Sequence, residues 1–266
     1  MSAHPPFSIV VNSNGQVYYS DLENIWMVDT DGSKRIVLHH IHNHELWLDD
    51  DDNLYGEDVQ NVGENYRHRV WRLDTNSDLS NVVEWTSGHP SDIGGIATIR
   101  NHRNESVILQ RPERAIVVGR ESASPRYISL DGIDGHIHEL TISPSGDIFV
   151  AIGSTIYRIE DGAITVDLYT PIDIERSLKF RFVHDRHALM GMYATDTDVY
   201  VSVYAGQYMV RIDESRKIHD GYRSAGGWSP SGVSVDDTGN VWVLEFSLRN
   251  QARVVRLDEK GTRTIF

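Results

Sequence analysis

The stretch from His42 to Tyr55 reads HNHELWLDDDDNLY, and much of it returns at His136–Phe149 as HIHELTISPSGDIF. Each copy places a His-x-His-Glu-Leu segment ahead of a polar turn and an aliphatic–aromatic pair, and the two copies align without a gap. A segment that returns in this way indicates a fold built from copies of one structural unit.

A second pattern, an aliphatic-alternating segment that usually ends in an acid, occurs six times. It occupies residues 25–29, 69–74, 114–119, 155–160, 208–213 and 253–258. An aromatic-rich segment and a turn of Asp, Asn, Ser and Gly precede most copies. Period-two alternation between such turns predicts β-strands, and no segment shows a convincing helical period. Four strands per unit, at a spacing of roughly 40 to 50 residues, predict an all-β fold: a six-bladed β-propeller with four antiparallel strands per blade.

The six units predict one domain over residues 1–266. The blades are expected to start near residues 7, 40, 89, 135, 187 and 228. Blade three has the weakest pattern, with an irregular stretch at 100–105, and blade five has the longest connecting segment, 171–186. Blade one already holds four strands and blade six ends in its own outer strand. We therefore expect the ring to close without a strand exchanged between the termini.

The composition excludes several functional classes. The chain has 266 residues, 25 Lys and Arg against 39 Asp and Glu, a formal net charge of −14 and no cysteine. The charge disfavours nucleic-acid and anionic-membrane partners, which attract the opposite sign. Without cysteine there is no disulfide, thiolate metal site or Cys nucleophile. The N-terminus lacks a basic region followed by a long apolar run, and no apolar run approaches the ~18 residues of a membrane span. A soluble cytoplasmic protein is expected, of undetermined oligomeric state.

The blade pattern also resembles a known family. Units such as GVSVDDTGNVWVLE from Gly232 and DTDGSKRIVL from Asp29 resemble the senescence-marker-protein/gluconolactonase family and its NHL-repeat relatives, over nearly the whole chain. The resemblance implies a divalent cation at one mouth of the central channel, held by several blades, often with lactone or ester hydrolysis. Peptidylglycine amidating lyase, a six-bladed propeller with histidine-held zinc, is similar in architecture only.

The resemblance also implies where a ligand would stand. One acidic ligand of that family lies just before the Gly-aliphatic start of an inner strand, and the matching positions here are His44, His138 and Ser231. Imidazole therefore stands where a carboxylate is expected. Because hard cations prefer oxygen ligands, this departure favours zinc, manganese or iron over calcium.

The two His-x-His pairs are the main candidates for metal ligands. Residues two apart on a strand share a face, so His42 projects with His44 and His136 projects with His138. The innermost strands face the channel, so pairs from blades two and four can reach one ion from two sides and leave it an open position. The glutamate after each pair should face the blade and orient imidazole. The alternative is that the histidines are polar loop residues bonded to backbone or water.

Further candidates lie on other blades. His187 opens blade five and can complete the ring of metal ligands, whereas His89, beside Pro90, fits a surface turn better. Glu57 and Glu245, near the exits of second strands, are candidate general bases beside a metal-bound water. The alternative for each glutamate is a blade-edge acid paired with an arginine.

Substrate-binding candidates lie in blades five and six. The stretch RSLKFRFVHDR, residues 176–186, is the one locally basic run and lies in the longest connection. Long loops over a propeller mouth are common places for ligand contacts, so Arg181 and Arg186 are expected to orient an anionic substrate. The alternative is a solvated connection. Trp228 precedes an inner strand and can form the floor of a pocket.

Together these features favour a metal-dependent hydrolase that acts on a small lactone or ester at the channel mouth. The ion would polarise the carbonyl oxygen and activate a water, and Glu57 or Glu245 would take the proton. The competing enzyme class is a metal-dependent lyase or isomerase with a free histidine as base. The third hypothesis is a non-catalytic propeller that binds a protein or peptide. The expected partner of an enzyme is a small molecule, anionic if the arginines bind it.

Overall fold

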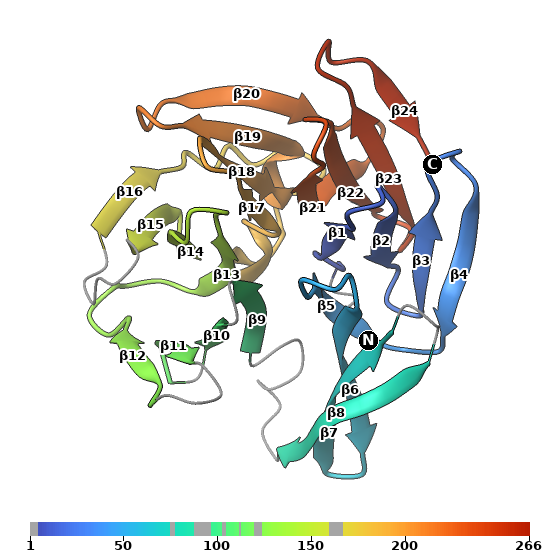
Figure 1. The fold of residues 1–266 in the computed structure, drawn as a ribbon. Coiled ribbons are helices and arrows are strands. Elements are labelled where there is room, and N and C mark those ends of the chain that lie inside the picture. Colours follow the sequence, from blue (N-terminus) through green and yellow to red (C-terminus); the bar gives the residue numbers. More distant parts are fainter. Residues whose placement is uncertain are drawn as a thin grey trace.

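The computed structural model describes residues 5–74, 78–87, 97–102, 105–111, 113–119, 124–159 and 167–266. Its strands form six four-stranded antiparallel sheets arranged in a ring (Figure 1). This confirms the predicted six-bladed β-propeller. Within these ranges no helix is long and apolar enough to cross a membrane.

Each blade uses four consecutive strands, numbered outward from the centre. Blade one consists of β1 (Ile9–Val11), β2 (Val17–Ser20), β3 (Asn24–Val28) and β4 (Lys34–His39). Blade two consists of β5 (Asn43–Leu48), β6 (Leu54–Val62), β7 (Asn65–Leu73) and β8 (Leu79–Ser87). Blade three consists of β9 (Ala97–His102), β10 (Glu105–Gln110), β11 (Ala115–Gly119) and β12 (Arg126–Ser129).

The second half of the ring repeats this order. Blade four consists of β13 (Ile137–Ile142), β14 (Ile148–Ile152), β15 (Thr155–Ile159) and β16 (Asp167–Pro171). Blade five consists of β17 (Met192–Ala194), β18 (Asp198–Val203), β19 (Tyr208–Asp213) and β20 (Ile218–Arg223), with the short 3-10 helices η2 (Asp185–His187) and η3 (Tyr204–Gly206). Blade six consists of β21 (Trp228–Val235), β22 (Val241–Ser247), β23 (Ala252–Leu257) and β24 (Arg263–Ile265). Every sheet is made of consecutive strands, so within the described residues the ring closes without an exchanged strand, as expected.

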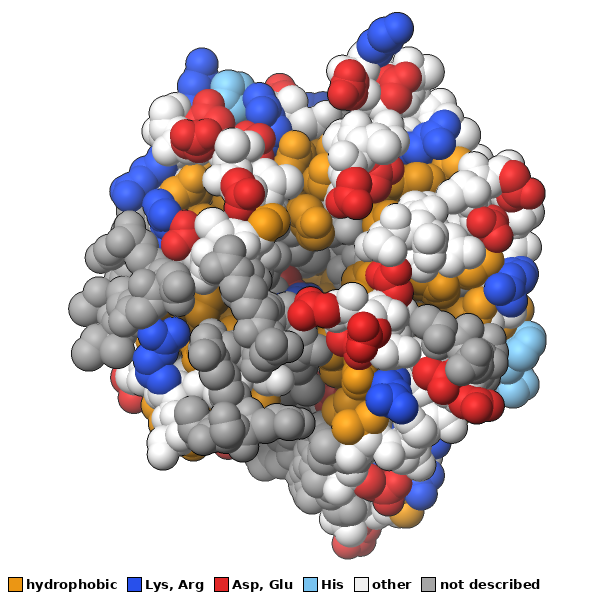
Figure 2. Space-filling model, viewed as in Figure 1, with side chains coloured by type: hydrophobic (Ala, Val, Ile, Leu, Met, Phe, Trp, Pro, Cys, Tyr) orange, Lys and Arg blue, Asp and Glu red, His pale blue; other side chains and the backbone are white. Residues whose placement is uncertain are grey.

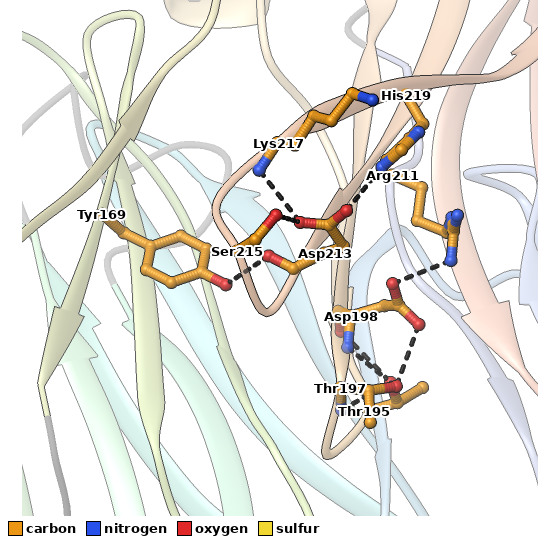
Figure 3. Close-up of polar contacts among 9 residues, drawn as sticks. All are labelled: Tyr169, Thr195, Thr197, Asp198, Arg211, Asp213, Ser215, Lys217 and His219. Carbon is orange, nitrogen blue, oxygen red and sulfur yellow. Dashed lines mark hydrogen bonds and ion pairs between the residues drawn. The ribbon is translucent and has the colours of Figure 1, made fainter.

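The acid that ends a third strand caps the turn into the fourth strand. Asp74, Asp213 and Asp258 each accept a hydrogen bond from the backbone N–H four residues further on, at 2.9, 3.0 and 2.7 Å. Asp213 also accepts from the Ser215 hydroxyl at 2.6 Å and lies 2.6 Å from Nε2 of His219 (Figure 3). The hydrogen bond from Ser215, then that from His219, hold the pKa of the Asp213 carboxyl well below its usual range. The recurring acid is therefore a turn residue.

The hydrophobic core lies largely between neighbouring blades. One cluster joins Ile25 of blade one to Leu46 and Trp71 of blade two, all fully buried. At the centre, backbones meet directly: a Cβ added at Gly191 or at Gly232 would lie 2.5 or 2.7 Å from the carbonyl oxygen of Phe7. Blades five and six therefore contact the N-terminal chain at these points with no room for a side chain.

One prediction about blade three was wrong. Residues 100–102, expected to be irregular, belong to β9, which pairs with β10 along its full length. The stretch lacks apolar alternation because β9 is an innermost strand that uses Arg100 for ion pairs, as described below.

Candidate functional site at the channel mouth

The histidine pairs lie where two innermost strands begin. β5 begins at Asn43, between His42 and His44, and β13 begins at Ile137, between His136 and His138. In a propeller of consecutive antiparallel blades, all innermost strands run in the same direction, so their first residues lie at one mouth of the ring. We call it the histidine mouth.

Both strands carry a β-bulge at the same position. His44 and Glu45 lie opposite a single residue of β6, and His138 and Glu139 lie opposite a single residue of β14. A bulge breaks the strict alternation of side chains between the two faces of a strand. The glutamates were expected to face the blade and orient imidazole; instead, both reach an arginine on the innermost strand of blade three.

His42 and His44 bring two ring nitrogens together. Their Nε2 atoms are 2.9 Å apart, and Nδ1 of His42 lies 3.2 Å from the carbonyl oxygen of Leu22. A carbonyl oxygen only accepts, so Nδ1 of a neutral His42 carries the proton and its Nε2 keeps a lone pair. That lone pair faces Nε2 of His44, which is buried beside the ring of Phe7 at a centroid distance of 6.0 Å.

His136 and His138 form a second pair in blade four. Their ring centroids are 5.1 Å apart, and Nε2 of His138 donates to the carbonyl oxygen of Gly153 at 2.9 Å. Burial, and then the charge of His136, lower the pKa of His138 to about 3. Partial burial, followed by the charges of Arg111 and Arg186, lowers the pKa of His136 to about 4. Both rings are therefore neutral at neutral pH.

Residues 176–187, the cover segment, reach both pairs. Phe180 is fully buried in a cluster with Met190, Tyr204 and Phe246, and this cluster also packs against Phe7 and Leu22 beside the His42–His44 pair. At the other end, η2 contacts β13, and Arg186 lies close enough for its charge to act on His136. The longest connection of the sequence therefore lies over the histidine mouth.

Arg100 joins three blades below this mouth. Its guanidinium lies 3.2 Å from Oε2 of Glu45 and 3.1 Å from Oε1 of Glu139, and both carboxylates are buried. Arg111 donates to the carbonyl oxygen of His138 at 2.6 Å and lies 3.9 Å from Oε1 of Glu45. Burial, and then the charge of Glu45, raise the pKa of Glu139 to about 8.

The two candidate bases differ in their surroundings. Glu245 is fully buried, accepts from the Tyr222 hydroxyl at 2.9 Å and accepts from Nε of Arg253 at 2.6 Å. This is the arrangement of a blade-edge acid paired with an arginine. Glu57 is also buried and lies on β6 next to the bulge of β5.

The predicted substrate residues, and His187 as a predicted metal ligand, lie around the same mouth. Arg186 and His187 belong to η2, and the guanidinium of Arg181 lies 4.5 Å over the ring of Phe182. Trp228 begins β21 and is half-buried, with the guanidinium of Arg253 4.1 Å over its ring. Of these, Arg186 is the residue whose charge acts on His136.

Four of the predicted metal ligands lie in two pairs, His42 with His44 and His136 with His138. Among the described residues, no set of three or more His, Cys, Asp or Glu side chains is arranged to hold a metal ion. The facing nitrogens of His42 and His44 supply two ligands, one fewer than the three protein ligands of a catalytic zinc centre. His89 lies outside the described residues. The five-histidine set therefore stays a prediction.

Sequence reasoning missed Arg100 and Arg111. One signal does point to Arg100. It lies on the innermost strand of blade three, and the blades on either side each have a buried glutamate at the same position of their innermost strand. Nothing in the sequence marks Arg111, whose role depends on the β10–β11 turn reaching the start of β13. A separate cavity of about 490 Å³, lined by Asp29, Asp236, Trp242 and Phe266 among others, contains none of the histidines.

Comparison with known proteins supports the fold. No family model matches this chain, and no curated protein matches it. The structure of virginiamycin B lyase from Staphylococcus aureus is 13% identical with a TM-score of 0.58, over 98% of this chain and 84% of that chain. A gluconolactonase from Xanthomonas campestris is 12% identical with a TM-score of 0.59, over 86% and 79%. A chain of a nidogen/laminin complex is 11% identical with a TM-score of 0.64, over 94% and 92%. At these identities, the chain shares a fold with lyases and lactonases, as the gluconolactonase resemblance predicted for the fold.

Proposed function

We propose that this chain is an enzyme of the lyase or isomerase type that removes a carbon-bound proton from a small anionic substrate at the histidine mouth. The observation that carries the proposal is that one cover segment reaches both histidine pairs and brings Arg186 close enough for its charge to act on His136. A mouth with neutral imidazoles, adjacent arginines and a covering segment has the parts that proton abstraction next to a carbonyl requires.

The roles follow from the surroundings of each side chain. His136 keeps contact with solvent, so a substrate can reach it, and it is neutral, so it can accept a proton. Negative charge that develops on a substrate oxygen beside Arg111 and Arg186 would offset the positive charges that weaken this base. The imidazole would therefore become more basic as the proton is transferred.

The charge distribution supports an anionic substrate. The described turns between third and fourth strands, at the opposite mouth, are rich in acids, such as Asp29, Asp74, Asp213 and Asp258. The turns and the cover segment at the histidine mouth mix acids with arginines and Lys179. Acidic side chains are also spread around the face shown in Figure 2. An anion would thus meet less repulsion at the histidine mouth than at the opposite one.

A divalent ion, if this site binds one, would have two protein ligands. The facing Nε2 atoms of His42 and His44 would hold it, and water or substrate oxygens would complete its coordination. When bound, such an ion would stabilise negative charge on a substrate oxygen. The same facing nitrogens favour a second candidate function, hydrolysis of a small lactone or ester, in which the ion would activate water.

Product analysis in heavy-oxygen water separates the two reactions. We expect the product of the lyase or isomerase reaction to contain no solvent oxygen, and the carbon-bound proton to exchange with deuterium in heavy water. Solvent oxygen in the product would establish hydrolysis instead.

Bound metal should be lost from a His42→Ala, His44→Ala double variant and retained by a His136→Ala, His138→Ala double variant.

Substitution of the base tests its assignment. We expect His136→Gln to lower kcat by about 10²- to 10⁴-fold, the usual contribution of a general base. His219→Gln is the matched control, because His219 lies on the outer strand β20 beside Asp213. Unchanged activity of the His136 variant would refute the assignment.

A further inference from the structure

Two large apolar side chains of the cover segment are exposed to solvent. Leu178 is 86% exposed and Phe182 is 85% exposed, whereas Phe180 between them is 1% exposed. Single exposed apolar residues are common, but these two lie on one short segment at the candidate site and alternate with Lys179 and Arg181. Full burial of such a side chain is typically worth about 1.5–3 kcal/mol, so an apolar ligand gains free energy here.

A third apolar side chain lies near the same place. Leu248, in the turn between β22 and β23, is 59% exposed. A Cβ added at Gly227 would lie 3.9 Å from Cδ1 of Leu248 and 3.9 Å from Nζ of Lys179. Leu248 and Lys179 therefore both lie beside Gly227, whose positive φ of +92° favours glycine. We call Leu178, Phe182 and Leu248 the apolar lip, and Lys179 and Arg181 its basic residues.

The segment that carries the lip is held in place. Arg176 donates to the carbonyl oxygen of Val183 at 2.6 Å and pairs with Asp185. The backbone N–H of Ser177 donates to the carbonyl oxygen of Ala205 at 2.9 Å, and Phe180 anchors the centre of the segment. Leu178 and Phe182 are therefore exposed on an ordered surface. Such a surface can bind a ligand without the entropic cost of ordering the segment first.

We propose that the apolar lip binds the hydrocarbon part of a small amphipathic carboxylate, whose anionic group pairs with Lys179 and Arg181. This inference rests on the proposed function and names its substrate class: a carboxylate with an apolar body of several carbons, in place of a polar sugar derivative. An extended anionic membrane would also face the acid-rich surface of the rest of the molecule and be repelled by its net charge of −14, whereas a small carboxylate would meet mainly Lys179 and Arg181.

Binding of simple carboxylates tests the proposal without any assay of catalysis. Acetate, octanoate and octylamine are titrated against the whole chain by calorimetry, with octanoate kept below its aggregation concentration. Each buried methylene contributes ~0.8 kcal/mol, so even partial burial should make octanoate bind at least about 10-fold more tightly than acetate. Octanoate should also bind more tightly than octylamine, because the flanking side chains are cationic.

Three double variants locate the binding. Leu178→Ser with Phe182→Ser should abolish the preference for octanoate over acetate, and Lys179→Glu with Arg181→Glu should abolish the preference for octanoate over octylamine. Tyr127→Ser with Ile265→Ser, on the outer strands β12 and β24, removes two exposed apolar side chains elsewhere and should change nothing. All substituted positions are exposed, and urea unfolding confirms that each variant is folded.

The outcome separates this inference from the proposed reaction. The His136→Gln variant should bind octanoate as the unsubstituted chain does, even though its catalysis is lost. Equal binding of acetate and octanoate, or undiminished octanoate binding by the Leu178, Phe182 double variant, would overturn the proposal. Octanoate binding that follows the lip, in a chain whose His136 variant stays active, would refute the catalytic assignment and leave the lip established.

Discussion

Arg100 is the residue on which the centre of the ring depends. It pairs with the buried Glu45 and also binds the buried carboxyl group of Glu139, so its removal leaves two acids without their common partner. Removing one partner of a buried ion pair typically costs about 3–5 kcal/mol. We expect Arg100→Met to lower the free energy of unfolding in urea by roughly 3 kcal/mol. Arg249→Met, at an exposed turn, is the control and should change it by less than about 0.5 kcal/mol. Equal stability of the two variants would contradict the role of Arg100.

Glu139 makes the stability of the fold depend on pH. Its pKa is raised from 4.5 to about 8, so the folded chain holds a proton that the unfolded chain has released between these values. The stabilisation from this proton is complete below pH 4.5 and is lost as the pH rises toward 8. We expect the free energy of unfolding to fall over this range and the Glu139→Gln variant to show a flatter profile. Glu64→Gln, at an exposed turn, should keep the original slope.

At the residue scale, the sequence predicted the histidine pairs but not their neighbours. The pairs were visible because the motif returns in register, and side chains two apart do share a face in the structure. The bulges were not visible, because a bulge depends on the pairing with the next strand and leaves no mark in the alternation of a polar segment. The predicted direction of Glu45 and Glu139 failed for this reason.

At the scale of the element, the cover segment should depend on Phe180. The ring of Phe180 is buried, whereas the ring of Phe182 is exposed. We expect Phe180→Ala to loosen the segment, so that trypsin cleaves after Lys179 or Arg181 roughly 10-fold faster, as for a local opening eased by ~1.4 kcal/mol. Phe182→Ala removes the same side chain from an exposed position two residues away and should leave the cleavage rate unchanged. Equal rates for both variants would show that Phe180 does not anchor the segment.

The place of the cover segment was predictable, but its contacts were not. Its length and basic charge mark a long loop over a propeller mouth. Which of its two phenylalanines is buried depends on Tyr204 and Phe246 from blades five and six, which are distant in sequence. The alternation of apolar and basic residues over 178–182 does not predict which phenylalanine is buried.

At the scale of the molecule, the number of blades was predictable because each blade repeats its own turn and strand signals. Five of the six third-strand segments end in an acid, and capping by Asp74, Asp213 and Asp258 gives the physical reason. The reaction was not predictable in the same way, because it depends on side chains from different blades and one fold serves many functions.

The closure of the ring should depend on Phe266. In the part of the chain that the structure describes, no strand crosses from blade six to blade one, so packing must hold these blades together. The ring of Phe266 lies 5.5 Å from that of Trp242 in blade six, and a Cβ added at Gly32 of blade one would lie 3.2 Å from it. Because Phe266 is half-buried, we expect Phe266→Ala to lower the free energy of unfolding by about 1–2 kcal/mol, less than for a core phenylalanine.

The neighbouring residue provides the control for this closure. Ile265 is 58% exposed, so Ile265→Ala should change the free energy of unfolding by less than about 0.5 kcal/mol. Both variants should keep a single urea transition with an unchanged slope, since the blades of one ring are expected to unfold together. If Phe266→Ala were as stable as Ile265→Ala, the contacts of β1 with β21 and β22 would suffice to close the ring without the aromatic contact.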